Sequence, residues 1–263
     1  MLKMEGLHVK TAGIVPIENL GEEPYASVLC YPQTNGTELQ ARLKELQEHN
    51  ITALEFTGGA SVCNVPVLGK GFVGVTVVAH LREQRVALKI RRVDADRTGL
   101  QHEAAMLAKA NLINVGPEFI SASTNFLLMQ FVDGMLLPKW LEMNREKTQV
   151  RRVLRAVLEQ CWQLDSAGLD HGELARAQKH VIVSRVNEPY ILDFESASSN
   201  RRTANVTGMC QYLFVGSSYV ARLIADVLGE RCRGEIIEAL RRYKRNRTRE
   251  SFYQLLRICF IKS

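Results

Sequence analysis

The chain has 263 residues, and at roughly 100–200 residues per domain this length allows one large domain or two small ones. Hydrophobic residues make up 46% of the chain and charged residues 24%, which excludes a mostly disordered, collagen-like or coiled-coil protein. The 34 Lys and Arg residues outnumber the 28 Asp and Glu residues, and the net charge of +6 suits a partner or ligand rich in phosphate.

The sequence gives no indication of export or membrane insertion. Residues 1–6 lack the apolar core of a signal peptide, and no stretch approaches the ~18 uncharged apolar residues of a membrane helix. The six cysteines are scattered and form no C-x-x-C pair, which disfavours a zinc ribbon or a redox pair. We therefore expect reduced thiols, a cytoplasmic location and no membrane partner.

Residues 1–62 predict an N-terminal extension with a helix and a strand. After several Gly, Pro and Asn turns, leucines at helical spacing predict a helix that Thr37 caps and Asn50 ends. Residues 51–57 alternate like a strand up to a pair of glycines.

The remaining pattern changes from strands to helices along the chain. We expect strands over 65–68, 75–79, 86–90 and 126–132, with a helix over 99–110. Further on we expect a long amphipathic helix over 150–165, short strands over 181–183 and 190–192, and helices over 205–260. This order predicts an α+β fold of two lobes, β-rich over 63–132 and helical over 133–263, with a cleft where they meet.

A glycine-rich motif lies between two predicted strands, with glycines at Gly69, Gly71 and Gly74. In Rossmann folds such a motif opens a helix, whereas β-branched, strand-like residues follow it here. The motif therefore predicts a hairpin whose backbone amides come close to phosphate oxygens. Lys89 on the next strand can hold those phosphates, and Glu103 on the following helix can pair with Lys89.

Two carboxylates in the second half suit phosphoryl transfer assisted by a metal ion. Glu173 lies in a polar loop after the long helix, and Asp193 ends a predicted strand. Hard oxygen ligands of this kind suit Mg²⁺, and the spacing leaves room for a β-hairpin that brings both carboxylates to one site. The reaction needs positioning, charge neutralisation and an acceptor for the hydroxyl proton.

In this order the motifs resemble those of the protein-kinase-like superfamily. Within it the chain is similar to the small atypical kinases of the RIO type and to the minimal kinase of the tRNA-threonylcarbamoylation machinery. It most resembles a predicted Ser/Thr protein kinase family found mainly in archaea. The shared signatures are V-L-G-K-G, A-L-K-I-R-R, D-H-G-E-L and D-F-E-S-A-S, at Val67–Gly71, Ala87–Arg92, Asp170–Leu174 and Asp193–Ser198.

The resemblance, which covers roughly residues 65–225, implies a two-lobed kinase fold that binds ATP. It implies that the three glycines cover the phosphates, that Lys89 binds the α and β phosphates, and that Glu103 orients Lys89. Gln130 to Val132 would form the hinge that bonds the adenine edge, with Met129 at the back of the pocket. The implied activity is transfer of the γ phosphate to Ser or Thr hydroxyls, including those of the chain itself.

The resemblance also assigns catalytic and metal-binding groups. Glu173 stands where these kinases carry the catalytic Asp, Asp193 matches the metal-binding Asp, and His171 matches a structural loop histidine. A second ligand of Mg²⁺ or Mn²⁺ is either Gln178, which a gap-free count and oxygen chemistry favour, or His180, which alignment by the following strand favours.

Departures from the kinase pattern leave other functions open. Glu173 is longer than Asp and shifts the carboxylate by about 1.5 Å, Glu195 replaces the Gly of D-F-G, and no A-P-E follows. The alternatives are an ATPase switch in the assembly of a complex or ribonucleoprotein, and a nucleotide-binding pseudokinase. A small-molecule kinase is a further alternative, which the short C-terminal part disfavours. The basic C-terminal helix is either a solvated face or a contact for RNA or a ribonucleoprotein.

Overall fold

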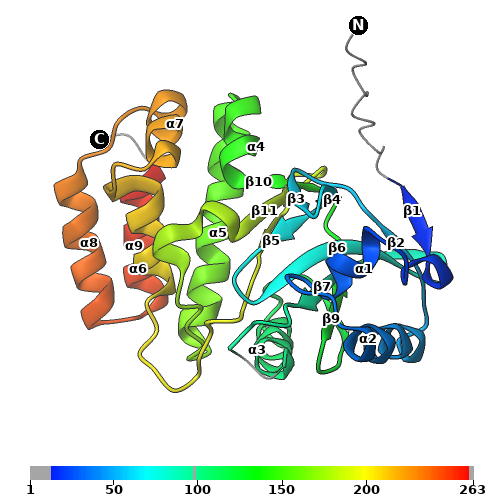
Figure 1. The fold of residues 1–263 in the computed structure, drawn as a ribbon. Coiled ribbons are helices and arrows are strands. Elements are labelled where there is room, and N and C mark those ends of the chain that lie inside the picture. Colours follow the sequence, from blue (N-terminus) through cyan, green and yellow to red (C-terminus); the bar gives the residue numbers. More distant parts are fainter. Residues whose placement is uncertain (1–12, 97–98, 261–263) are drawn as a thin grey trace, which may run out of the picture. The chain divides into compact units, whose positions relative to one another are not determined.

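The computed structural model describes residues 13–96 and 99–260, which fold into two compact units (Figure 1). The first unit runs up to Gln101 and resumes over Phe119–Phe131, and the second consists of His102–Glu118 and the chain from Val132 onward. Each unit combines helices with antiparallel strands. The mixed α and β composition expected from the sequence is therefore confirmed.

The first unit is built on a seven-stranded antiparallel sheet. Its strands follow the order β1-β2-β6-β7-β9-β8, and β5 pairs with β6. The bounds are β1 Ile14–Pro16, β2 Ile51–Glu55, β5 Gly69–Lys70, β6 Gly74–Leu81, β7 Gln84–Arg91, β8 Phe119–Ala122 and β9 Phe126–Gln130. A separate hairpin consists of β3 Ala60–Val62 and β4 Val65–Val67.

Three short or medium helices complete this unit: the 3-10 helix η1 Ile17–Asn19, α1 Tyr25–Leu29 and α2 Gly36–Glu48. The expectation that Thr37 caps α2 is wrong, because Asn35 Oδ1 accepts a 2.9 Å hydrogen bond from the backbone N–H of Thr37. Thr37 therefore lies in the first turn, where Asn35 already satisfies its free N–H. The helix ends at Glu48, just before Asn50, whose φ of 58° is left-handed.

Apolar side chains on one face of the sheet form the core of the first unit. Alternate residues of β6 and β7 are buried there with leucines of α2, namely Val75, Val77, Ala79, Val86, Leu88, Ile90, Leu39 and Leu46. Each such side chain contributes about 1.5–3 kcal/mol on burial. Because successive residues of a strand point to opposite faces, Lys89 projects from the face away from this core.

The second unit is mainly helical. Its helices are α3 Gln101–Asn111, of which Gln101 belongs to the first unit, α4 Leu137–Met143, α5 Lys147–Ser166, α6 Asn205–Cys210, α7 Tyr219–Leu228, α8 Arg233–Arg245 and α9 Arg249–Phe260. It also contains the 3-10 segment η2 Leu174–Lys179, the π-helical turn η3 Gln211–Val215, and a sheet of β10 Gly134–Leu136, β11 Val181–Ser184 and β12 Pro189–Ile191. Over the described residues, no helix has both the length and the apolar character needed to span a bilayer.

Helix α5 positions the loop that carries Glu173. One face of α5 is buried in the core of the unit, and Asp165 near its C-terminal end accepts 2.9 Å hydrogen bonds from both the backbone N–H and the side-chain Nδ2 of Asn205. Asn205 in turn donates to the carbonyl of Leu169 at 2.8 Å and accepts from the N–H of His171 at 2.8 Å. These buried hydrogen bonds fix the backbone immediately before Glu173.

Candidate functional site

The glycine-rich segment of the first unit forms a tight hairpin. The backbone N–H of Gly71 donates to the carbonyl of Gly74 at 2.8 Å, and β5 pairs with β6. A Cβ atom at Gly74 would lie 2.8 Å from the carbonyl oxygen of Ile90 and 3.1 Å from Cγ of Lys89. Only glycine fits at this position, because the backbone carbonyl of Ile90 cannot move aside as a flexible side chain could. Phe72 at the turn is 92% exposed.

Contacts to the rest of the first unit hold this hairpin. Lys70 Nζ donates to the hydroxyl of Tyr31 at 2.6 Å, and the Arg92 side chain donates to the carbonyl of Gly71 at 3.2 Å. Gly69 has no atom near the place of a Cβ, so nothing in the packing demands glycine at that position. The hairpin is therefore an ordered element with an exposed tip.

Lys89 and the expected adenine hinge lie on neighbouring strands. Lys89 on β7 is opposite Leu127 of β9, and its residue surface is only 7% exposed. Strand β9 ends with Met129 and Gln130, and the buried residue Val132 lies shortly after its end. The two units divide between Phe131 and Val132, so the expected hinge coincides with the passage of the chain from one unit to the other.

In the second unit, Glu173 and Asp193 both approach the same ring nitrogen of His180. His180 Nε2 is 3.6 Å from Glu173 Oε2 and 4.0 Å from Asp193 Oδ2. His180 ends η2 and is largely buried, whereas Gln178 in the same segment is exposed. The structure thus places three of the residues singled out from the sequence next to one another.

Asp193 and Glu195 form a carboxylate cluster with Glu103 of α3. One oxygen from each of the three residues lies within 4.8 Å of the other two, and Glu103 is 3% exposed. Carboxylate oxygens with this separation can share a Mg²⁺ or Mn²⁺ ion. From the sequence alone, Glu195 stands out only as a replacement for glycine. The D-F-E pattern could have indicated the role of Glu195. Phe194 is buried, so the acidic side chains on either side of it both point away from the core.

The backbone of Asp193 is strained. Its φ is 69°, in the left-handed region that costs a residue with a Cβ roughly 1–2 kcal/mol. The preceding strand β12 ends at Ile191, and the carbonyl of Leu192 accepts a hydrogen bond from His171. Strained residues of this kind are frequent at functional sites.

His171 has a structural role in this region. Its Nε2 lies 2.9 Å from the carbonyl oxygen of Leu192, and its ring packs against Phe194 and His180. Burial lowers the pKa of His171 to about 4. The ring is therefore neutral near pH 7, with an N–H on Nε2 that donates to Leu192.

Three further contacts bind the Glu173 loop to the segment after Asp193. Asp170 and Ser198 exchange backbone hydrogen bonds of 2.9 and 2.8 Å, and the Arg201 guanidinium pairs with the Asp170 carboxylate. Ser196 Oγ donates to Glu173 Oε1 at 2.5 Å. Gly172 has a left-handed φ of 94°, and a Cβ there would collide with Arg201. No local sequence pattern relates Ser196 to Glu173, so the sequence alone does not indicate this contact.

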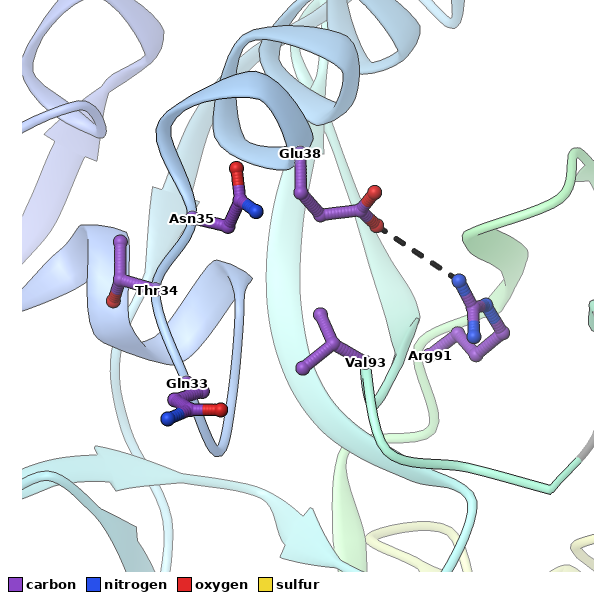
Figure 2. Close-up of a pocket in the computed structure, with 6 residues that line it drawn as sticks. All are labelled: Gln33, Thr34, Asn35, Glu38, Arg91 and Val93. Atoms are coloured by element: carbon purple, nitrogen blue, oxygen red, sulfur yellow. Dashed lines mark ion pairs between the residues drawn. The ribbon is translucent and has the colours of Figure 1, made fainter.

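The described residues also line a polar pocket in the first unit, shown in Figure 2. It has a volume of about 410 Å³ and is lined by Gln33, Thr34, Asn35, Glu38, Arg91 and Val93. Arg91 lies 3.8 Å from Glu38 and donates to Asn125 Oδ1 at 3.0 and 2.9 Å. Gly69, Gly71, Gly74, Lys89, Gln130 and Val132 are not among the residues that line this pocket.

The basic C-terminal helix α8 exposes Arg241, Arg242, Lys244 and Arg245, while Tyr243 between them is buried. Arg202 donates to the carbonyl of Lys244 at 3.0 Å and thereby adds a further cation at the end of the helix. Cations at this end are favoured by the helix dipole, and they also suit binding to phosphate groups.

Comparison with known proteins gives no functional assignment. No protein-family model matches the chain. The chain is similar to an uncharacterised protein, MJ1211, of Methanocaldococcus jannaschii, with 29% identity over 100 residues that cover 38% of this chain and 83% of that protein. The function must therefore be argued from the site itself.

Proposed function

We propose that the protein is an atypical ATP-dependent kinase with a two-lobed kinase-like fold, which transfers the γ phosphate of ATP to Ser or Thr hydroxyls. In this proposal the glycine-rich hairpin and Lys89 bind the phosphates, and Gln130 to Val132 contact adenine. Glu173 accepts the hydroxyl proton, and Asp193 binds the metal ion.

The observation that carries this proposal is the approach of Glu173 and Asp193 to the same histidine nitrogen, at 3.6 and 4.0 Å. These two carboxylates come from separate loops of the second unit, one after α5 and one after β12. A proton acceptor beside a metal-binding carboxylate is what phosphoryl transfer requires in addition to nucleotide binding. The strained backbone of Asp193 adds support, because a strained conformation persists only where its surroundings enforce it.

The carboxylate cluster fits the metal ion that the proposal needs. Glu103, Asp193 and Glu195 offer three hard oxygen ligands within 4.8 Å of one another, which suits Mg²⁺ or Mn²⁺. A bound ion would neutralise charge on the nucleotide phosphates during transfer. Glu195 would then contribute to the metal site together with Asp193, and His180 would lie beside Asp193.

The test uses ATP radiolabelled at its γ phosphorus, with Mg²⁺ or Mn²⁺ and the full chain. We expect label on Ser or Thr of the chain or of an added protein, and loss of labelling in Lys89→Met and Asp193→Asn. Asn is chosen for Asp193 because it tolerates a left-handed φ better than Ala. Matched controls are Lys44→Met and Asp133→Asn, which change exposed residues. Circular dichroism checks that each variant folds.

The outcomes separate the proposal from its alternatives. Free phosphate without labelled protein would indicate an ATPase switch, and ATP binding without turnover would indicate a pseudokinase. Wild-type labelling by Lys89→Met or Asp193→Asn would contradict the assigned site. Glu173→Asp tests the longer carboxylate: we expect labelling to fall about 100-fold, because a shift of about 1 Å at a catalytic group can have that effect.

A further inference from the structure

Ser196 presents its hydroxyl directly to the carboxylate proposed as proton acceptor. Ser196 Oγ donates a hydrogen bond to Glu173 Oε1 at 2.5 Å, at the short end of the range for hydrogen bonds from a hydroxyl to an oxygen. Ser196 is partly exposed and follows the metal-binding candidates Asp193 and Glu195 in the chain. A hydroxyl in contact with a general base is the arrangement that an acceptor of a phosphoryl group needs.

The backbone around Ser196 is held in place by its own set of contacts. The Arg201 guanidinium donates to the carbonyl of Ser196 at 2.6 Å and also pairs with Asp170 at the start of the Glu173 loop. Two backbone hydrogen bonds join Asp170 to Ser198. The contact between Ser196 and Glu173 is therefore built by the fold of the second unit, and it does not depend on a freely rotating surface side chain.

We propose that Ser196 is the site of autophosphorylation within one chain, an inference that rests on the kinase function proposed above. In this step Ser196 Oγ attacks the γ phosphorus of ATP and forms an O–P bond. The bond between the γ phosphorus and the oxygen that bridges it to the β phosphorus breaks, and ADP leaves. Glu173 Oε1 takes the proton of Ser196 Oγ, so the products are phosphoserine, ADP and a protonated Glu173.

The charge of the product favours a change in the position of the segment that carries Ser196. A phosphoserine carries about −1.5 to −2 charges at pH 7, and at residue 196 it would stand against Glu173 and next to Glu195 in the chain. Once Glu173 has released the proton it took from Ser196, like charges repel, and the phosphorylated segment would leave its place beside Glu173. Because Ser196 has a single hydroxyl, we expect no more than one phosphate per chain from this step.

The experiment incubates the purified full chain with ATP and Mg²⁺ or Mn²⁺ and measures its intact mass and its tryptic peptides. The peptide Val186–Arg201 contains Ser196, Ser198 and Ser199, and fragmentation distinguishes them. We expect phosphate on Ser196, none in Ser196→Ala, and phosphothreonine in Ser196→Thr. The matched control Ser199→Ala removes an exposed hydroxyl that contacts Lys109 and should keep the phosphate.

Two further measurements test whether the step is intramolecular and whether the variant still binds ATP. The rate per chain should not depend on protein concentration, and a Lys89→Met chain with an intact Ser196 should stay unlabelled when mixed with the wild type. Calorimetry should give Ser196→Ala the same ATP affinity as the wild type. Loss of ATP binding in Ser196→Ala would overturn the inference, since the serine would then support the site instead of accepting phosphate.

The results also separate this inference from the proposed function. Phosphate only on an added protein, or only on Ser198 or Ser199, overturns the role of Ser196 and leaves the kinase proposal standing. Phosphate that reaches the Lys89→Met chain only in the mixture with the wild type overturns transfer within one chain and also leaves the kinase proposal standing. Absence of any ATP turnover by the wild type overturns both.

Discussion

The hydroxyl of Tyr243 on α8 donates a 2.9 Å hydrogen bond to Asp165 Oδ2, near the end of α5. The same carboxylate also accepts the backbone N–H groups of Asn205 and Val206, which open α6. Asp165 therefore joins three helices, and through Asn205 it holds the loop that leads to Glu173.

Tyr243→Phe removes one donor from this buried carboxylate. We expect the free energy of unfolding to fall by about 1–3 kcal/mol, because a hydrogen bond to a charged group is lost and the carboxylate oxygen becomes less well satisfied. Urea unfolding followed by circular dichroism measures the change. Unchanged stability would show that the remaining donors suffice for Asp165.

Tyr212→Phe makes the same substitution at a tyrosine whose hydroxyl, unlike that of Tyr243, makes no hydrogen bond to the described residues. Tyr212 is 4% exposed, and its buried hydroxyl has no hydrogen-bond partner among the described residues. Removal of an unsatisfied buried hydroxyl should leave stability unchanged or raise it by about 1–2 kcal/mol. A clear loss of stability, measured as for Tyr243→Phe, would mean that a water molecule satisfies this hydroxyl.

The burial of Tyr212 predicts that the free energy of unfolding of the wild type and of Tyr212→Phe differs in its dependence on pH at alkaline pH. Burial raises the pKa of Tyr212 from 10.0 to about 12. Ionisation of this phenol therefore does not affect the stability of the fold below pH 10, and it lowers that stability as pH rises towards 12, because the unfolded chain ionises first. At about pH 11 the wild type should lose about 1.4 kcal/mol more than Tyr212→Phe. Equal losses in urea titrations at about pH 9 and about pH 11 would argue against this burial effect.

Glu195→Gln tests the metal cluster apart from catalysis. The change removes one of three carboxylates but keeps the size of the side chain, so affinity for Mn²⁺ should fall about 10-fold or more. Calorimetric titration of Mn²⁺ without nucleotide measures it, and Glu83→Gln, at an exposed turn between β6 and β7, is the control. Equal Mn²⁺ affinity in the wild type and both variants would exclude Glu195 as a ligand.

The sequence was sufficient to predict the helices and strands that have long periodic patterns. Strands β6 and β7 span eight residues each, and α5 spans twenty, so their alternation or helical spacing could be recognised. Strands β1, β3 and β10 have three residues each and were not expected from the sequence, whereas the equally short β4 and β12 were expected close to their observed bounds. At the start of the helices expected over 205–260, α6 passes into the π-helical turn η3, a change of hydrogen bonding that residue spacing does not reveal.

The residues of the candidate site were likewise only partly predictable from the sequence. Glu173, His180 and Asp193 were found because their loop and strand-end positions follow a known pattern, and the structure brings them together. The association of Glu195 with Glu103 and that of Ser196 with Glu173 depend on contacts between segments far apart in the chain. Such contacts are set by tertiary packing, and only the alternation around Phe194 gave a local signal for Glu195.

The basic end of α8 yields a prediction about RNA. Replacement of Arg242, Lys244 and Arg245 by Gln should weaken binding to unstructured single-stranded RNA, because each cation that contacts a phosphate releases counterions. If all three make such contacts, the slope of log affinity against log salt concentration should become less steep by about 2. Fluorescence anisotropy at several salt concentrations measures both quantities. The control replaces three exposed cations elsewhere, namely Lys44, Arg155 and Arg222. An equal effect of the control would attribute binding to net charge, and no binding by the wild type would leave α8 as a solvated helix end favoured by its dipole.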